Sequence, residues 1–315
     1  MHQHPVMFSH AWNRPYLPTG GAEKVYLLIE TKGVKVDSSD RAQMNLSLVL
    51  DRSGSMSGRP LQFSKRACRQ SGIGITVMGV GERFDEELME RMAEHGGGNF
   101  HFIEKPDEIP AIFQKELEGL LAVTAQNLSL TIEPADCASI TGIYGYACEK
   151  QGNRYNFHAG ELFAGEVKTV LLKLTLHPHT KGVHQLLRLT WEYVDVTDGA
   201  SPCTVVSEVS AEFTNDINLL NLSEDAEVYK QIQLTESAKI IEDAMQVLDE
   251  GDVPLGKLML KQQAERLMSA AIHMDDEVLR QESERLYSQL ENFGFNSITR
   301  KQLHEQKYRQ MKRKR

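Results

Sequence analysis

Several features that would assign the chain to a common class are missing from its 315 residues. No apolar run reaches the roughly 18 residues of a membrane-spanning helix, and no cationic start with an apolar stretch opens the chain. We therefore expect a cytoplasmic protein. The four cysteines are scattered without a Cys-x-x-Cys pair, which favours free thiols over disulfides or a zinc site.

Catalytic patterns are also missing. The sequence shows no Ser-His-Asp or Cys-His arrangement, and its 11 histidines lack metal-ligand spacing to one another or to cysteine. This absence favours a protein that is not an enzyme. It is weak evidence, because catalytic groups come together in space and need not be close in the sequence.

Charge is unevenly distributed. The net charge is −9, yet residues 300–315 hold eight Lys and Arg against one acid, Glu305. We expect residues 296–315 to form a solvated basic tail, through which any contact with nucleic acid or an anionic membrane would be made. The acidic remainder does not suggest a nucleic-acid surface.

The first half of the chain alternates strand and helix patterns. After a tail at residues 1–20, residues 21–124 form one predicted unit. Apolar runs predict strands at residues 24–36, 45–50, 73–80 and 100–103, and helical spacing predicts helices at 61–70, 85–95 and 109–122. Alternation of this kind predicts a parallel sheet covered by helices, which is a Rossmann-like α/β fold.

The second half has two further patterns. Residues 125–218 alternate apolar and polar side chains with a period of two, which predicts an antiparallel β-sandwich. Residues 219–295 follow helical spacing with short connections, which predicts an α-helical hairpin or small bundle.

One loop carries chemistry. The strand at residues 45–50 runs directly into Asp51-Arg52-Ser53-Gly54-Ser55, and a helix is expected after it. Serine hydroxyls and a carboxylate suit a hard divalent cation, and open α/β sheets place ligands at the carboxyl ends of strands. The alternative is a serine-rich turn in which Asp51 caps the following helix.

At these residues the sequence resembles the von Willebrand factor type A family, particularly bacterial members that carry a sandwich and a helical tail. Asp51, Ser53 and Ser55 match the family's metal-ion-dependent adhesion site, and the segments 79–85 and 96–100 resemble the last third of such a domain. The resemblance implies Mg²⁺, or Mn²⁺ or Ca²⁺, whose coordination is completed by a carboxylate of a protein partner. It also places Gly54 and Met56 in the partner-binding rim.

The resemblance has a gap in its middle. Family members carry further strands, a metal-binding threonine and a second metal-linked aspartate between the first helix and the next-to-last strand. Here Arg69-Gln70 continues directly into Ser71-Gly72-Ile73. The family's middle segment is thus predicted to be deleted, so that the remaining strands close up or leave an open edge that invites self-association.

Two segments could replace the missing ligands. Thr197-Asp198-Gly199 has the right residues, but it follows an alternating strand and is better explained as a hairpin turn. Glu82 and Asp85 follow the carboxyl end of a strand and are better candidates, although both also suit a helix start.

The leading hypothesis is a non-enzymatic interaction module that uses this partial metal site to bind an acidic partner. A first alternative is a metal-free scaffold acting through the sandwich and the helices. A second is a metal-dependent hydrolase, for which no nucleophile or general base is apparent.

Overall fold

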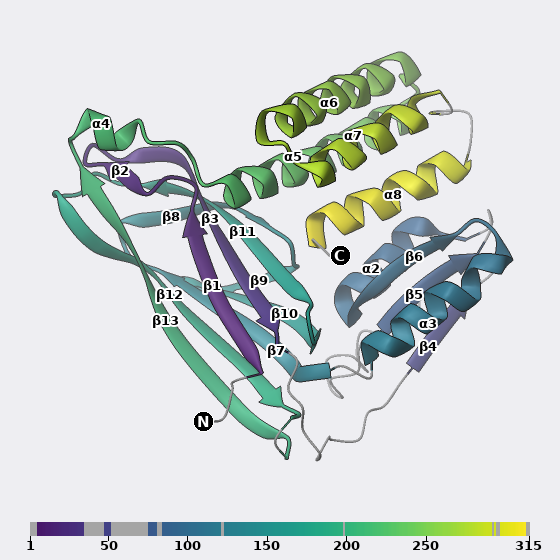
Figure 1. The fold of residues 1–315 in the computed structure, drawn as a ribbon, viewed down its shortest axis with the longest axis horizontal. Helices are drawn as coiled ribbons and strands as arrows, with labels where there is room; N and C mark the ends of the chain where they lie inside the picture. The colour runs from purple at the N-terminus through teal and green to yellow at the C-terminus, as the bar shows by residue number, and fades with distance from the viewer. Residues whose placement is uncertain are drawn as a thin grey trace.

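The computed structural model describes residues 5–34, 47–51, 75–80, 84–120, 123–197, 199–291, 293 and 297–312. These residues form a β-sandwich, a small parallel sheet with its helices, and a helical part that contacts both (Figure 1). The fold is therefore α/β with an added sandwich and C-terminal helices, as the sequence predicts. No helix within the described ranges is long and apolar enough to cross a membrane.

The sandwich consists of a four-stranded and a six-stranded sheet with orders β1-β3-β11-β8 and β2-β13-β12-β7-β10-β9. The strands of the first sheet are β1 (Val6–Trp12), β3 (Ala22–Gly33), β8 (Ala138–Tyr144) and β11 (Val167–Leu176). Those of the second are β2 (Tyr16–Pro18), β7 (Val123–Pro134), β9 (Cys148–Gln151), β10 (Arg154–Phe163), β12 (Gly182–Asp195) and β13 (Ser201–Thr214).

The sandwich extends further toward the N-terminus than the sequence predicts. The tail predicted at residues 1–20 is wrong for residues 5–20, because β1 pairs along its whole length with β3 and β2 pairs with β13. Similarly, β3 belongs to the sandwich and not to the α/β unit, since its partners are β1 and β11. These strands complete a closed apolar core, in which Val6 and Leu17 are buried.

Trp191 lies at the centre of this core. Its side chain is 1% exposed, its ring lies 4.5 Å from that of Phe8, and its indole N–H donates to Thr31 Oγ1 at 3.2 Å. A buried tryptophan needs a partner for its single donor. β1 and β3 supply both the packing and the acceptor, so the N-terminal strands are needed to complete the core.

The hairpin interpretation of residues 197–199 is confirmed. β12 and β13 pair antiparallel up to Asp195 and Ser201, and the chain turns between them. Gly199 has a φ of +66°, a conformation that glycine adopts easily. Asp198 itself lies outside the described residues.

The small sheet has three parallel strands in the order β4-β5-β6. β4 (Ser47–Asp51) and β5 (Ile75–Val80) pair directly, and β6 (Gly97–Ile103) lies beside β5. Between β5 and β6 comes α2 (Glu86–Gly96), and after β6 come a short 3₁₀ turn, η2 (Pro106–Glu108), and α3 (Ile109–Leu120). The helix predicted at residues 61–70 lies outside the described residues.

The helical part follows the sandwich through a short α4 (Ile217–Leu220). α5 (Ala226–Asp249), α6 (Val253–Met274) and α7 (Glu277–Leu290) are the three predicted helices. Each begins at an aspartate, Asp225, Asp252 or Asp276, whose carboxylate accepts a backbone N–H of the first turn. Such caps satisfy donors that the helix leaves unpaired.

The C-terminal segment is a fourth helix, α8 (Ser297–Lys312), which lies between α5 and α2 (Figure 1). The solvated tail predicted at residues 296–315 is therefore wrong for residues 297–312. Leu303 and Tyr308 are buried, and so are the polar Lys301, His304 and Gln306. The basic side chains of this segment pair with carboxylates of neighbouring helices. These ion pairs take the place of the hydration that the same charges would have in a solvated tail.

Candidate functional site

The predicted metal loop begins at the carboxyl end of the small sheet. Asp51 is the last residue of β4, and in the parallel pairing it lies opposite Gly79 of β5. This is the edge at which open α/β sheets hold ligands, because the loops after parallel strands meet there. The backbone of Asp51 thus lies where the sequence predicts; Ser53, Gly54, Ser55, Met56 and Glu82 lie outside the described residues.

An aromatic contact lies next to Asp51. A Cβ atom added at Gly79 would overlap the ring of Phe84, so glycine is required for that ring to lie against β5. The Phe84 ring also packs 6.4 Å from Phe100 and 6.1 Å from Phe102, both on β6. Phe84 is therefore held against β5 and β6, at the strand position that pairs with Asp51.

Asp85 follows Phe84 and starts α2. Its Oδ1 accepts the backbone N–H of Leu88 at 2.9 Å, while its side chain is exposed. The observed contact is thus the helix-start role that the sequence also suggests for this residue. A metal role for Asp85 or Glu82 stays a prediction. Across the part of the chain that the structure describes, no group of three or more His, Cys, Asp or Glu side chains could hold a metal ion.

α8 contacts the same segment through a buried lysine. Lys301 is 3% exposed; its Nζ donates to Phe84 O at 3.1 Å and to Glu86 Oε2 at 2.7 Å, and it lies 4.2 Å from the centre of the Phe84 ring. Burial alone would raise the pKa of Glu86, but the hydrogen bond and charge of Lys301 lower it overall. The C-terminal helix thereby holds Phe84 and the first turn of α2 in place.

A second buried pair lies one turn further along α2. Glu90 accepts from His304 Nδ1 at 3.0 Å and from Lys307 Nζ at 2.9 Å. Burial raises the pKa of Glu90, and the bonds from His304 and Lys307 outweigh it, so that the pKa is lowered. Glu90 is therefore a carboxylate held between two helices by two donors.

Sequence reasoning missed this interface, although a signal for it exists. Arg300, His304 and Lys307 recur at spacings of four and three, which places them on one face of a helix. Glu86 and Glu90 recur at four on α2. The sequence therefore contains two charged stripes of opposite sign. The helix is nevertheless hard to predict as packed, because apolar periodicity is the usual signal of a packed helix and α8 has no apolar stripe.

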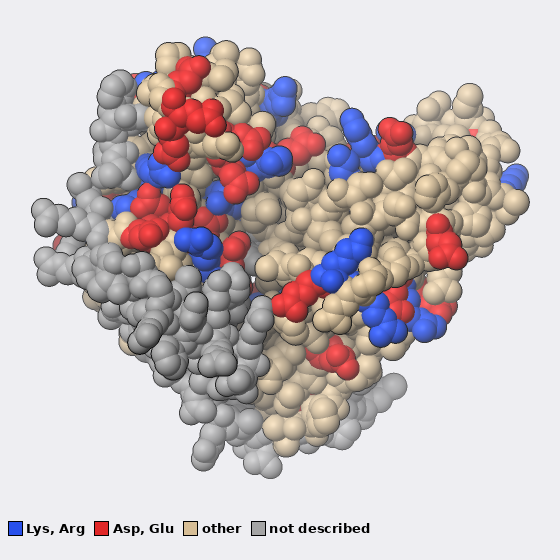
Figure 2. All heavy atoms as spheres, turned by 180° about the vertical axis from the view of Figure 1, so that it is seen from behind, with Lys and Arg blue, Asp and Glu red and all other residues tan. Residues whose placement is uncertain are grey.

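The charged side chains of the helical part are visible on the molecular surface. Lys, Arg, Asp and Glu are interspersed over it on the face shown in Figure 2, where they are denser than over the sandwich. Interspersed charges of both signs fit helices joined by ion pairs.

Comparison with known proteins agrees with this architecture. No protein-family model matches the chain. A von Willebrand factor type A structure from Catenulispora acidiphila superposes with a TM-score of 0.65 at 13% identity, covering 90% of this chain and 89% of that one. The ArnB paralog VWA2 of Sulfolobus acidocaldarius superposes with a TM-score of 0.59 at 12% identity and covers 98% of both chains.

The chain has the von Willebrand factor type A fold. The two superpositions cover 90% and 98% of this chain, so the similarity is not confined to the small α/β sheet. The human COPII-coat protein Sec24c is also similar, with a TM-score of 0.52 and 10% identity over 80% of this chain and 34% of its own. At such identities the likeness concerns the fold alone.

Two curated proteins that are similar in sequence to this chain are both named as uncharacterized proteins. YfbK of Escherichia coli is 29% identical over 125 residues, which are 38% of this chain and 22% of YfbK. A protein of Synechocystis is 20% identical over 182 residues, 52% of this chain and 43% of its own. The chain therefore spans less than half the length of each curated relative.

Proposed function

We propose that this protein is a non-enzymatic, cytoplasmic protein-interaction module. The contact would be made at the loop after β4, where Asp51, Ser53 and Ser55 would hold a divalent cation and Gly54 and Met56 would form the rim. The single observation that supports this proposal is the position of Asp51 at the carboxyl end of a parallel strand in a type A fold.

The donor set fits a hard cation. Two hydroxyls and one carboxylate are oxygen ligands, which Mg²⁺ prefers, with Mn²⁺ or Ca²⁺ as substitutes. Three protein ligands leave coordination positions for water or for a carboxylate of a partner. When bound, the cation would supply a positive charge that attracts this carboxylate, and the protein residues would orient it. Binding would join two molecules and break no bond.

The direct test is calorimetric titration of Mg²⁺ and of Mn²⁺ into the whole protein and into its Asp51→Ala variant. We expect saturable, weak binding to the unmodified protein, since three ligands are few, and no binding to Asp51→Ala. Asp136→Ala is the matched control, because Asp136 is an exposed aspartate in a turn of the sandwich, and it should bind as the unmodified protein does.

Two outcomes would contradict the metal site. Binding that survives Asp51→Ala would place the cation elsewhere on the molecule. An unmodified protein that binds neither cation would leave the metal-free scaffold as the better function. That alternative has its own support, since Leu255, Leu258 and Ile272 of α6 are between 43% and 70% exposed and offer an apolar contact surface.

A further inference from the structure

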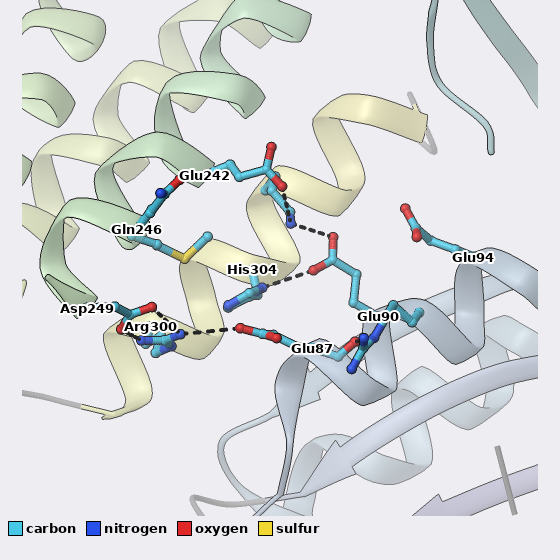
Figure 3. A pocket seen from close by; sticks show the side chains of 11 residues that line it. Glu87, Glu90, Glu94, Glu242, Gln246, Asp249, Arg300 and His304 are labelled. Carbon is cyan, nitrogen blue, oxygen red and sulfur yellow. Dashed lines mark hydrogen bonds and ion pairs between the residues drawn. The ribbon is translucent and has the colours of Figure 1, made fainter. Parts of the chain in front are cut away.

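A cavity of about 420 Å³ lies between α2, α5 and α8, apart from the carboxyl edge of the small sheet (Figure 3). Three of its carboxylates come from α2 and two from α5. They are Glu87, Glu90, Glu94, Glu242 and Asp249. Three cationic side chains, Arg91, Arg300 and Lys307, also line the cavity, so its lining is acidic overall.

Two of these cations form ion pairs with carboxylates of the lining or of the adjoining turn of α2. Lys307 Nζ lies 2.9 Å from Glu90 and 3.7 Å from Glu242. Arg300 pairs with Asp249 and lies 3.0 Å from Glu86. Glu94, in contrast, is half-buried at the edge of the cavity and has no ion-pair partner among the described residues. The lining therefore includes one carboxylate without an ion pair in the described part of the chain.

A buried histidine nitrogen provides a second, independent feature. His304 is 4% exposed, and its Nδ1 faces Glu90 at 3.0 Å. Its Nε2 is buried without a hydrogen-bond partner in the described part of the chain, and Figure 3 shows this nitrogen turned away from Glu90. Because a carboxylate can only accept, Nδ1 carries the proton toward Glu90, and in the neutral ring Nε2 presents a lone pair.

We propose that this cavity binds an arginine side chain from a basic segment of a partner protein. An acceptor nitrogen and an unpaired carboxylate in one acidic cavity both call for a ligand that donates hydrogen bonds and carries positive charge. A guanidinium group has five donors in one plane, so it can reach acceptors that lie on different walls. It is also less strongly hydrated than an ammonium group, which favours entry into a half-enclosed site.

Glu94 is the group to vary, because the described residues include no partner of Glu94 whose loss would disturb the fold. Binding of a fluorescent Gly-Arg-Gly-Arg-Gly peptide to the whole protein should be saturable at about 0.15 M salt, where exposed charges are screened. Glu94→Gln should weaken it about tenfold, as expected for one charge-assisted hydrogen bond, and Glu94→Lys should abolish it. Circular dichroism establishes that each variant is folded.

The matched control is Glu284→Lys, which changes an equally charged but exposed residue of α7 that does not line the cavity. It should bind the peptide as the unmodified protein does. Equal loss in both variants would mean that only net charge matters, and undiminished binding to Glu94→Lys would place the peptide elsewhere. The corresponding lysine peptide and spermidine should bind more weakly; equal affinity would overturn the choice of arginine.

A measurement without mutation tests the histidine directly. The ¹⁵N chemical shift of His304 Nε2 should move when the arginine peptide is added, because the lone pair then accepts a hydrogen bond. An Nε2 signal that stays in place while the peptide binds would remove His304 from the site. Asp51→Ala should leave peptide binding unchanged, so this proposal can fail or stand independently of the metal site.

Discussion

At the scale of single residues, Gly79 links the sheet to the start of α2. Because Gly79 has no side chain, the Phe84 ring can lie against β5 at this position, which is also the one that pairs with Asp51. From the sequence, a glycine in an apolar run signals only a weak point in a strand or a close approach of some other group. Which group approaches is decided by the packing of the next turn.

Gly79→Ala is therefore expected to destabilise the protein by about 1–3 kcal/mol, since a buried ring must be displaced to admit the new methyl group. Urea unfolding followed by circular dichroism measures this change. Gly20→Ala is the matched control, because a Cβ at Gly20 would meet nothing within 4 Å. Equal stability of the two variants would show that the Phe84 ring moves aside without cost.

At the scale of elements, α8 contacts its neighbours through many polar side chains in addition to the buried Leu303 and Tyr308. Besides its pairs with Glu86 and Glu90, it places Gln306 and Gln310 against the buried Glu282 of α7, at 2.8 Å and 3.0 Å. Burying charged groups is stabilising only when each finds a partner, so the fit of α8 depends on the matching of individual charges.

Lys301→Met tests this dependence. It should lower the free energy of unfolding by about 3 kcal/mol, because Glu86, whose side chain is 15% exposed, loses its closest cation. Adding Glu86→Gln should restore part of the loss, and the double-mutant cycle measures the coupling between the two residues. Lys261→Met, which alters an exposed pair on α6, should change stability by less than about 0.5 kcal/mol. Additive effects of Lys301→Met and Glu86→Gln would contradict the pairing.

At the scale of the whole molecule, the contact between α8 and α2 makes stability depend on pH. The pKa values of Glu86 and Glu90 lie below the ordinary 4.5 in the folded protein. Their contribution is therefore complete above pH 4.5 and is lost as the pH falls through the lowered values. Burial raises the pKa values of Glu282 and Glu305, and these two groups act in the opposite direction.

Comparison of the unmodified protein with Glu90→Gln isolates one of these groups. The unmodified protein should be the more stable at pH 7, and the difference should shrink as the pH falls below 4.5, since protonated glutamate and glutamine carry the same charge. The measurement is the free energy of unfolding in urea at a series of pH values. A difference that does not change with pH would mean that the charge of Glu90 does not stabilise the contact with α8.

Much of this architecture was predictable because burial leaves a periodic pattern. Alternating apolar residues predict β7, β11, β12 and β13, and helical spacing predicts α5, α6 and α7, since each of these elements packs one apolar face. The position of Asp51 at a strand end was also predictable, because an apolar run ends directly before it. Local sequence suffices where an element hides apolar surface along its own length.

Only the tertiary structure decided the partners of the remaining elements. β1 and β2 are short, and nothing in their sequence indicates that β1 pairs with β3 or that β2 pairs with β13, which lies far along the chain. α8 has almost no apolar face, so the sequence alone predicts that its cations are solvated. In the structure they pair with Glu86, Glu90 and Glu282 instead. The sequence by itself determined which segments hide apolar surface. Pairing between distant strands and distant charges depends on contacts that no local pattern records, and these contacts closed the sandwich and formed the cavity lined by His304.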